Sequence, residues 1–279
     1  MQQIDVTELE PPRYKLGSGE FGRVFDALFH GKPVVYKIMK HAIHNKVLFE
    51  NELQILYSLK NMPNVPLVYG FARCKERNIF YIVMEKAPGI TLYNYVCYTD
   101  IPFLSRLFIA KNICRTIARL HERNVMYRDL KPDNIVIDPI NNHHVLIDFG
   151  LAVQCTSMSD CVDGMVGTPG YMAPEIYREQ TYSFPVDIYS LGMTLYFLFR
   201  CREAERLSVL RYHLHHSNTP KFIQSIILDC LWTSPCRRPT AIRLYHAFAD
   251  IYDRLDNQSK KQEKKKKSLW SWWCGECIS

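Results

Sequence analysis

The chain has 279 residues, of which 47% are hydrophobic, 13% aromatic and 23% charged. This length suits one large domain or two lobes with an ample core, and the composition is ordinary for a soluble globular protein. Six lysines and two glutamates in residues 257–279 contribute +4 of the formal charge of +7, which leaves only about +3 for the body. The body therefore lacks the basic surface with interleaved aromatic residues that nucleic-acid binders carry, and we expect no nucleic-acid partner.

No stretch of the sequence is apolar for long enough to cross a bilayer. The longest apolar run, Leu191–Phe199, is typical of a buried helix. The start Met1-Gln2-Gln3 indicates neither a signal peptide nor a myristoylation site. Ten cysteines are scattered, mostly in apolar patterns such as those around Cys114 and Cys230, which favours reduced buried thiols and a cytoplasmic protein.

A glycine-rich segment follows a polar lead-in, residues 1–13, in which we expect no helix. The segment comprises Leu16, Gly17, Ser18, Gly19, Glu20, Phe21, Gly22, Arg23 and Val24. Its G-x-G-x-x-G pattern is weak evidence alone, because it also suits a dinucleotide-binding turn that opens a helix. The residues after Gly22, including Phe25, Ala27 and Leu28, indicate a second strand instead. This favours a hairpin whose backbone approaches phosphates closely.

The next two predicted elements each contain one charged residue among apolar neighbours. Val34–Ile38 is typical of a strand and contains Lys37, which alone could be a surface lysine or a cation that binds phosphates. Leu48–Leu59 has helical apolar spacing and contains Glu52, which in isolation we would expect to be solvated. Neither residue is decisive by itself.

A boundary between two lobes is predicted near residue 85. Ile79–Met84 is typical of a strand, and Glu85–Gly89 ends in a Pro-Gly turn. Beyond it, Arg106–Arg123 shows helical spacing with one apolar face. The segment 85–89 therefore looks like a connector between an N-terminal and a C-terminal part.

The most informative stretch is Tyr127–Asn134, between that helix and the apolar run Ile135–Ile137. It is predicted to be a loop that enters a strand, and it carries an acid, a base and an amide: Asp129, Lys131 and Asn134. Asp148-Phe149-Gly150 follows at the spacing of a hairpin. Asn134 and Asp148 can then converge as hard oxygen ligands, which suits Mg²⁺ beside phosphates.

Together these motifs resemble the eukaryotic-type protein kinase family, in its serine/threonine branch, from about Tyr14 to about Leu255. The resemblance implies an α+β, bilobal protein kinase fold, with a small β-rich N-lobe that has one main helix and a larger helical C-lobe. It divides the chain into a lead-in (1–13), a kinase domain (14–256) and a basic tail (257–279). Within the domain, the N-lobe is 14–84, the hinge 85–89 and the C-lobe 90–256. ATP, Mg²⁺ and protein substrates are the implied cofactors and partners.

The resemblance also implies a role for each site residue. Asp129 would accept the proton of the substrate hydroxyl, and Lys131 would neutralise the transferred group. Lys37, oriented by Glu52, would bind the α- and β-phosphates. The implied metal ligands are Asn134 and Asp148. The implied nucleotide contacts are the glycine-rich segment 16–24, Val35 with Val24 above the adenine, Val136 below it, Met84 as gatekeeper, and the backbone of Glu85 and Ala87.

Several supporting contacts are implied as well. Asp187 would hold the backbone of the catalytic loop, and Arg238 would pair with Glu175. Tyr127 stands where the family commonly has histidine, and we expect it to pack with Leu56, Val68 and Phe149. Lys131 and Thr168 are the residues of serine/threonine kinases. Within the activation segment 151–165, phosphates on Thr156, Ser157 or Ser159 could pair with Arg128.

The sequence departs from the family pattern in two other places. Tyr36 replaces the usual aliphatic residue before the lysine. The segment from Asp187 to Arg238 is compact, which puts the usual peptide-docking surface in doubt but not catalysis.

The tail allows three interpretations. Its lysines, 260–267, are followed by Trp270, Trp272, Trp273, Cys274 and Cys277. Such a run can be a solvated tail, a nuclear import signal, or a peripheral contact with an anionic membrane, with acylated cysteines as a second anchor. The sequence leaves these open, and it does not indicate the oligomeric state.

Other function classes are less consistent with the motifs. A pseudokinase scaffold usually lacks the lysine, the catalytic aspartate or the metal-binding aspartate, whereas this chain has Lys37, Asp129 and Asp148. A small-molecule kinase would not need the peptide-binding loop that Gly167–Glu175 resembles. A membrane- or nucleic-acid-binding protein defined by its tail would leave most of the chain unexplained.

Overall fold

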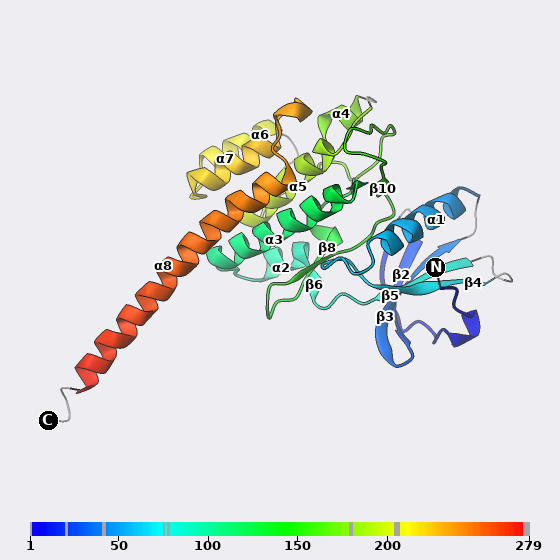
Figure 1. The fold of residues 1–279 in the computed structure, drawn as a ribbon, viewed down its shortest axis with the longest axis horizontal. Coiled ribbons are helices and arrows are strands. Elements are labelled where there is room, and N and C mark those ends of the chain that lie inside the picture. The colour runs from blue at the N-terminus through cyan, green and yellow to red at the C-terminus, as the bar shows by residue number, and fades with distance from the viewer. Residues whose placement is uncertain are drawn as a thin grey trace.

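The computed structural model describes residues 2–19, 22–40, 43–74, 76, 79–178, 181–203 and 207–275. Two parts are visible: an N-terminal part built on one sheet and a larger, mainly helical part from which the last helix projects (Figure 1). This arrangement confirms the expected bilobal fold.

The N-terminal sheet has five antiparallel strands in the order β1-β2-β3-β5-β4. Their bounds are β1 (Tyr14–Gly19), β2 (Gly22–Phe29), β3 (Lys32–Lys40), β4 (Val68–Cys74) and β5 (Ile79–Glu85). Helix α1 (Ile43–Ser58) packs on one face, where Phe49 stacks on Phe80 of β5 with ring centroids 4.7 Å apart. Because side chains alternate along a strand, the opposite face needs its own cover.

The lead-in supplies that cover. Ile4 is buried in a cluster with Tyr36, and the backbone of residues 2–4 bonds to Phe71 of β4. Tyr36 donates its hydroxyl to the Leu28 carbonyl at 2.7 Å, which accounts for an aromatic residue at this position. The expectation of no helix here was wrong: a short 3₁₀ helix, η1 (Val6–Glu8), forms because Asp5 and Glu8 make a capping box.

The C-terminal part contains most of the helices. Their bounds are α2 (Leu92–Tyr98), α3 (Phe103–Glu122), α4 (Pro174–Tyr177), α5 (Pro185–Arg200), α6 (Leu207–His215), α7 (Lys221–Cys230) and α8 (Ala241–Gly275). The short strands β6 (Ile90–Thr91), β8 (Ile135–Ile137) and β9 (His144–Leu146) form one small sheet, and β7 (Val125–Met126) pairs with β10 (Val153–Gln154). Two 3₁₀ helices, η2 (Pro132–Asn134) and η3 (Pro235–Arg237), complete the described elements.

Helix α5 is the buried axis of this part. Leu191, Leu195, Tyr196 and Leu198 are each 0% exposed, so the apolar run is a core helix, as predicted. Its N-terminus places Asp187 beneath the loop between β7 and β8, and α3 passes alongside it. The catalytic motifs are therefore anchored to the most deeply buried helix.

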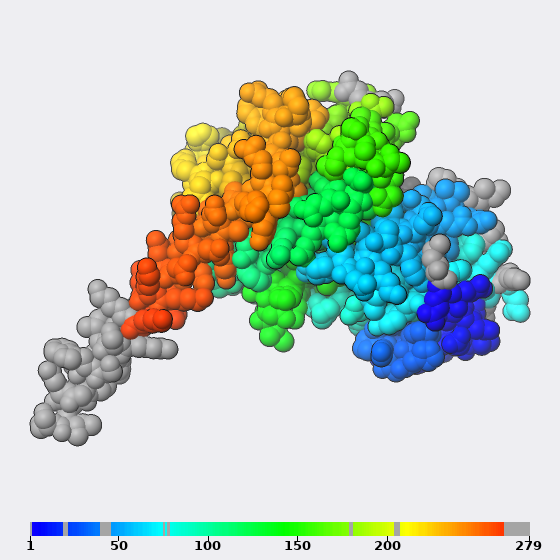
Figure 2. All heavy atoms as spheres, viewed as in Figure 1, coloured from blue at the N-terminus to red at the C-terminus, as the bar shows by residue number. Residues whose placement is uncertain are grey.

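Helix α8 does not end at residue 257. It packs along α3 in its first half and then extends away from the body (Figures 1 and 2). No proline interrupts it, and lysine and glutamine are good helix formers, so the basic segment continues the helix. In the part of the chain that the structure describes, no helix has the length and apolar character that a membrane span requires.

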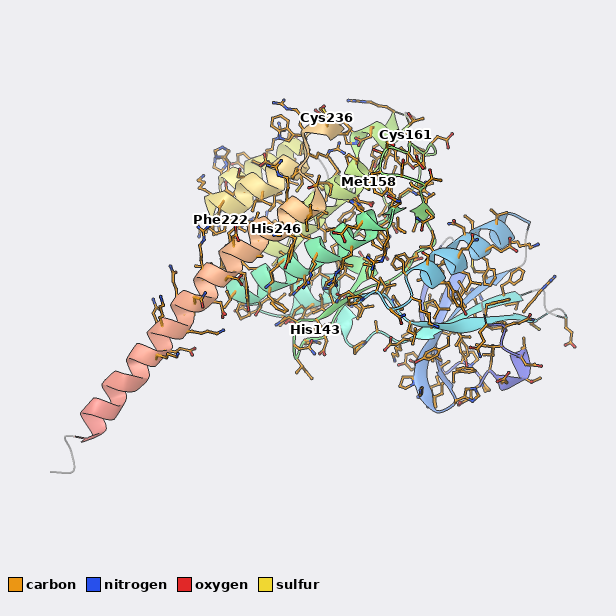
Figure 3. All side chains as sticks on the ribbon, viewed as in Figure 1. His143, Met158, Cys161, Phe222, Cys236 and His246 are labelled. Carbon is orange, nitrogen blue, oxygen red and sulfur yellow. The ribbon has the colours of Figure 1, made fainter. Side chains whose placement is uncertain are left out.

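The described cysteines are all free, but fewer are buried than the sequence suggested. Cys114, Cys155 and Cys230 are buried. Exposed cysteines include Cys161 and Cys236, which lie at the surface of the helical part (Figure 3).

Candidate active site

Lys37 lies in the middle of β3, opposite Val24 of β2 and Ile82 of β5. Its Nζ lies 2.6 Å and 2.7 Å from the two carboxylate oxygens of Glu52 on α1. The side chains of Lys37 and Glu52 are 4% and 1% exposed. Lys37 is therefore not a surface lysine, and Glu52 is not solvated. The sheet and α1 bring the two together across 15 residues of sequence.

Asp148 is the third member of this cluster. Its Oδ1 accepts a hydrogen bond from Lys37 Nζ at 2.7 Å and one from the Gly150 amide at 3.2 Å. A Cβ at Gly150 would lie only 3.2 Å from both Lys37 Nζ and Asp148 Oδ1. The glycine therefore lets the backbone approach a crowded pair of charges.

The charges of the cluster support one another. Burial alone would lower the pKa of Lys37, but the carboxylates of Glu52 and Asp148 outweigh it and raise that pKa. Burial raises the pKa of Glu52 against the opposing effect of Lys37. For Asp148, burial is outweighed by the Lys37 ammonium, which lowers the pKa of the carboxyl. Lys37 and Asp148 are thus held in their charged forms.

The catalytic-loop candidates form a second network around Asp129. Its Oδ2 accepts a hydrogen bond from Asn134 Nδ2 at 2.8 Å and lies 3.1 Å from Lys131 Nζ. Its Oδ1 accepts one from Thr168 Oγ1 at 2.6 Å, and Lys131 donates to the same hydroxyl oxygen at 2.5 Å. Sequence reasoning used Thr168 only as a marker of kinase type and missed it as a partner of Asp129. The T-P-G-Y pattern was the available signal.

Asp187 fixes the backbone of this loop. Its Oδ1 accepts from the Arg128 amide at 2.8 Å, and its Oδ2 accepts from the Tyr127 amide at 2.9 Å. The same Oδ2 contacts His121 Nε2 at 2.9 Å. Arg128 has a φ of +69°, a conformation that costs on the order of 1–3 kcal/mol for a residue with a side chain. The two hydrogen bonds from a fully buried carboxylate hold it there.

Tyr127 links the loop to the N-terminal part. Its ring meets that of Phe149 edge-on, with centroids 5.2 Å apart, and its hydroxyl donates to the Ile147 carbonyl. Both rings belong to one hydrophobic core with Leu56 of α1 and Val68 of β4. The packing expected for this tyrosine is therefore present.

The residues expected around the nucleotide lie on β2, β3, β5 and β8. Val24 opposes Lys37, and Val35 opposes Met84, in the register of the sheet. Val136 is 9% exposed on β8. The amide of Glu85 donates to the Leu67 carbonyl at 2.8 Å, so this amide is not free to bond the adenine edge. The expected contact of the Glu85 backbone would therefore have to use its carbonyl. Ala87 follows β5 in the connector.

The glycine-rich segment is a hairpin. Gly17, Ser18 and Gly19 of β1 pair with Val24, Arg23 and Gly22 of β2, which rules out the helix that a dinucleotide-binding turn would open. Gly22 has a φ of +146°, and a Cβ there would lie 2.6 Å from the Ile38 carbonyl oxygen. Leu16 is 46% exposed at the start of the hairpin. Glu20 and Phe21 lie outside the described residues.

Asn134 and Asp148 fit the expected magnesium site in their chemistry. The Asn134 amide nitrogen is used by Asp129, and no described donor reaches its Oδ1. Asp148 is 41% exposed, its carboxyl has a lowered pKa, and no described donor reaches its Oδ2. Two hard oxygens are therefore available, which is the ligand type that Mg²⁺ takes beside phosphates.

A family model described as the protein kinase domain matches residues 12–248. The chain belongs to the protein kinase family. It is 28% identical over 277 residues to a probable serine/threonine-protein kinase of Dictyostelium discoideum, covering 94% of this chain and 45% of that one. It is 30% identical over 244 residues to the calcium/calmodulin-dependent protein kinase cmkA of Emericella nidulans, covering 81% and 58%. With the serine/threonine-protein kinase Sgk2 of Mus musculus it shares 31% over 191 residues, covering 65% and 50%.

This kinase chain spans about half the length of the curated relatives it matches. The relatives from Dictyostelium discoideum and Mus musculus are serine/threonine-protein kinases by name, and the family match includes the residues that form both networks described above.

Proposed function

We propose that this kinase domain transfers the γ-phosphoryl group of ATP to serine and threonine hydroxyls of protein substrates, in the cytoplasm and with Mg²⁺. The observation that carries the proposal is the pair of networks. Lys37 and Glu52 form a buried ion pair that the partly exposed Asp148 joins, and Asp129, Lys131 and Asn134 meet on the adjoining loop.

Phosphoryl transfer passes through a loose transition state, so the protein mainly positions groups and offsets charge. Asp129 orients the acceptor hydroxyl and takes its proton at a carboxylate oxygen. Lys131 and Lys37 place ammonium groups against the transferred and the remaining phosphates. Asn134 and Asp148 would hold Mg²⁺, which when bound neutralises phosphate charge. Positioning of this kind is worth roughly 7–11 kcal/mol.

Serine/threonine specificity rests on Thr168. Its hydroxyl bridges Asp129 and Lys131, which places the loop 167–175 directly against the acid and the base. A loop held there admits a short hydroxyl side chain to Asp129.

The proposal is tested with Asp129→Ala and Lys37→Met. The first removes the proposed proton acceptor and the second removes the ammonium group proposed to bind the phosphates, so we expect phosphorylation of a generic basic protein to fall at least about 100-fold. Phosphoamino-acid analysis of the wild-type product should show phosphoserine and phosphothreonine. Circular dichroism checks that each variant is folded. Wild-type turnover in either variant, or phosphotyrosine as the main product, would refute the proposal.

Activation-segment phosphorylation is proposed as the regulatory step. Thr156 and Ser157 both donate hydroxyl and amide hydrogen bonds to the Asp160 carboxylate. A phosphate on either hydroxyl would repel that carboxylate and release the turn. The phosphate could then pair with Arg128, whose guanidinium at present donates to the Leu151 carbonyl and the Tyr182 hydroxyl. Replacing Thr156, Ser157 and Ser159 together by alanine should abolish activation. Unchanged activity after this replacement and phosphatase treatment would contradict the proposal.

For residues 260–279 we propose peripheral contact with anionic membranes. Its support is the sequence, with lysines beside tryptophans, and the direction of α8, which extends the backbone of residues 260–275 away from the body (Figure 1). Co-sedimentation with phosphatidylserine vesicles should be lost when the six lysines are changed to glutamine. Absence of wild-type binding, or nuclear accumulation that depends on these lysines, would contradict it.

A further inference from the structure

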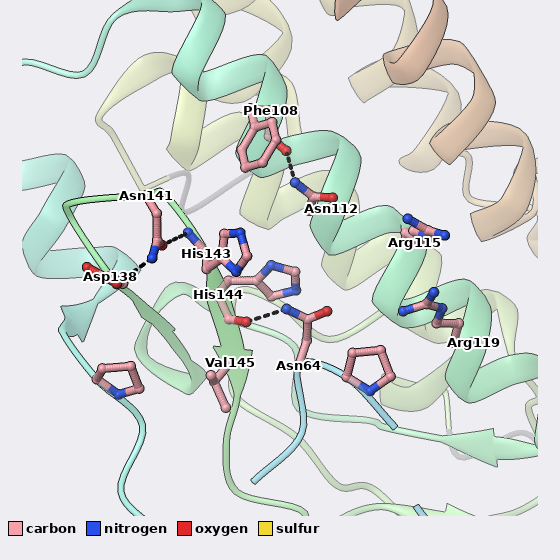
Figure 4. A pocket seen from close by; sticks show the side chains of 12 residues that line it. Asn64, Phe108, Asn112, Arg115, Arg119, Asp138, Asn141, His143, His144 and Val145 are labelled. Atoms are coloured by element: carbon pink, nitrogen blue, oxygen red, sulfur yellow. Dashed lines mark hydrogen bonds between the residues drawn. The ribbon is translucent and has the colours of Figure 1, made fainter. Parts of the chain in front are cut away.

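A cavity of about 560 Å³ lies away from both catalytic networks. It opens between α3, the turn that joins β8 to β9, and the segment before β4 (Figure 4). Its lining is Pro63, Asn64, Pro88, Phe108, Asn112, Arg115, Arg119, Asp138, Asn141, His143, His144 and Val145. A volume in this range is typical of sites that bind small molecules or a few residues of peptide.

The charge of the cavity is positive. Arg115 and Arg119 lie one turn apart on α3, and among the described residues neither comes within 4 Å of a carboxylate. Asp138, the one acidic residue of the lining, has both oxygens occupied. One accepts from the Ile140 amide at 3.0 Å and the other from Asn141 Nδ2 at 2.8 Å. It therefore closes its own turn without an ion pair to either arginine, and two arginines against one carboxylate leave the lining with a net charge of +1.

A buried histidine in the wall lacks one partner. His144 is 1% exposed, its Nε2 contacts Thr116 Oγ1 at 2.9 Å, and its carbonyl accepts from Asn64 Nδ2 at 2.6 Å. Its Nδ1 has no partner among the described residues. A buried polar atom without a partner costs about 1–3 kcal/mol. Because this atom has almost no accessible surface, His144 supports the wall of the cavity and leaves Arg115 and Arg119 as the groups that a ligand would meet.

The basic surface continues beyond the cavity. Lys111, Arg115 and Arg119 recur every four residues along one side of α3, and Arg123 follows at its C-cap, so the row spans about 18 Å. Lys111 and Arg115 make cation–π contacts with α8: their cationic groups lie 4.0 Å and 5.5 Å from the ring centroids of Tyr252 and Tyr245. An extended peptide of about five residues spans this length, whereas a single anion does not.

We propose that the cavity and this row of basic residues form a docking site for an acidic or phosphorylated segment of a partner polypeptide. Arginine recognises carboxylates and phosphates through two parallel hydrogen bonds, and clusters of arginines are the usual readers of such motifs. One anionic side chain enters the cavity and meets Arg115 and Arg119. The remaining acidic residues lie along α3. The site is independent of phosphoryl transfer, so it stands or falls separately from the proposed activity.

The test uses the full chain and a short fluorescent peptide with one phosphoserine flanked by glutamates. Fluorescence anisotropy should show binding to the wild type and at least about tenfold weaker binding to Arg115→Gln/Arg119→Gln, because charged hydrogen bonds are lost. The matched control is Arg243→Gln/Arg254→Gln, which removes the same charge from exposed positions on α8. This control should bind as the wild type does. Basal phosphorylation of a generic basic protein should be unchanged in both double variants.

Each alternative has its own readout. No binding by the wild type, or equal weakening in the two double variants, would overturn the proposal. So would displacement of the peptide by inorganic phosphate at equal concentration, which would identify a free anion as the ligand. Binding of phosphatidylserine vesicles, but not of the peptide, through Arg115 and Arg119 would likewise overturn it. If the double variant is unfolded, Arg119→Lys keeps the charge but loses the paired hydrogen bonds, and it should still weaken binding several-fold.

Discussion

Lys37 shows how a single ammonium group can organise a site at the scale of one residue. Two carboxylates reach its Nζ, one from α1 and one from the loop after β9. Glu52 is buried, with both carboxylate oxygens bonded to Lys37, whereas Asp148 is 41% exposed and no described donor reaches its Oδ2. Glu52 therefore sets the position of Lys37, and Asp148 remains available for a metal ion.

The variant Glu52→Gln tests this division. It leaves Lys37 without its fixed counter-charge, so we expect kcat/KM for ATP to fall about 10- to 100-fold, the equivalent of one charged hydrogen bond. Glu50→Gln is the matched control, because Glu50 lies on the same helix but is 59% exposed. Equal effects of the two substitutions would show that the Lys37–Glu52 pair does not position the lysine.

His144 gives a prediction about pH and stability. Burial lowers the pKa of this ring to about 3, so the folded protein keeps it neutral while the unfolded chain protonates it near pH 6.5. Between these values the unfolded chain binds more protons, and stability must fall as the pH falls. From pH 7 to pH 5 this single group removes about 2 kcal/mol. His143, Arg115, Arg119 and Asp138, which face the same cavity, are unchanged in the comparison below.

Urea unfolding of the wild type and of His144→Gln at both pH values measures the effect. The variant loses the contact with Thr116 at either pH, so only the change between pH 7 and pH 5 is compared. That change should be about 2 kcal/mol smaller in His144→Gln. His246→Gln, at an exposed position of α8 (Figure 3), should behave as the wild type. Identical pH dependence in all three proteins would exclude a buried neutral histidine.

At the scale of elements, the buried pair Glu175–Arg238 joins α4 to the segment before α8. The guanidinium donates to both carboxylate oxygens, at 2.6 Å and 2.8 Å, and also to the carbonyls of Trp232 and Pro185. Glu175 is 4% exposed and Arg238 is 7% exposed. One side chain thus holds four acceptors from three segments.

Arg238→Met should therefore be severely destabilising. It leaves a buried carboxylate without a partner, and breaking such a pair costs about 3–5 kcal/mol. Denaturant unfolding measures the loss. Arg237→Met is the control, because Arg237 is exposed and lies over the Trp232 ring. A loss below about 1 kcal/mol in Arg238→Met would mean that the pair is not structural.

Elements with a long hydrophobic period could be predicted from the sequence, and strands of only two residues could not. The helix at 185–200 and the strand at 79–85 have enough apolar residues to define their faces. Strands β7 and β10 have only two residues each and exist because they pair with one another. The short helix η1 is an exception, because Asp5 and Glu8 stand at the spacing of a capping box in the sequence.

At the scale of the whole molecule, the sequence predicts those contacts of the site whose residues lie close together in one motif. Asp129, Lys131 and Asn134 lie within six residues, so their meeting follows from one loop. The link between Lys37 and Glu52 rested on resemblance, because a strand and a helix must pack before it forms. No pattern in the sequence indicates the cavity beside α3. Asn64, Arg119 and His143 come from three distant segments, and each is unremarkable alone.

A second hollow lies next to the catalytic loop, and we expect it to favour basic substrates. It has a volume of about 440 Å³ and is lined by Asp133, Thr168, Pro169, Gly170, Tyr171, Met193 and Glu203. Burial raises the pKa of Tyr171, and the charges of Glu203 and Asp133 raise it further, so the field in this hollow is negative. Asp133 and Glu203 are exposed and form no ion pair among the described residues. A cationic side chain of a substrate would therefore be attracted to the position beside Thr168.

We expect a peptide with an arginine close to its phosphorylated serine to be used about tenfold better, in kcat/KM, than the same peptide with norleucine. Asp133→Asn/Glu203→Gln should remove this preference by raising KM for the arginine peptide, while kcat changes little because both residues lie outside the catalytic networks. Glu122→Gln/Asp253→Asn, at exposed positions on α3 and α8, removes the same charge and should keep the preference. If the preference survives in the first double variant, or is lost equally in the second, the attraction comes from the net charge of the protein and not from the hollow beside Thr168.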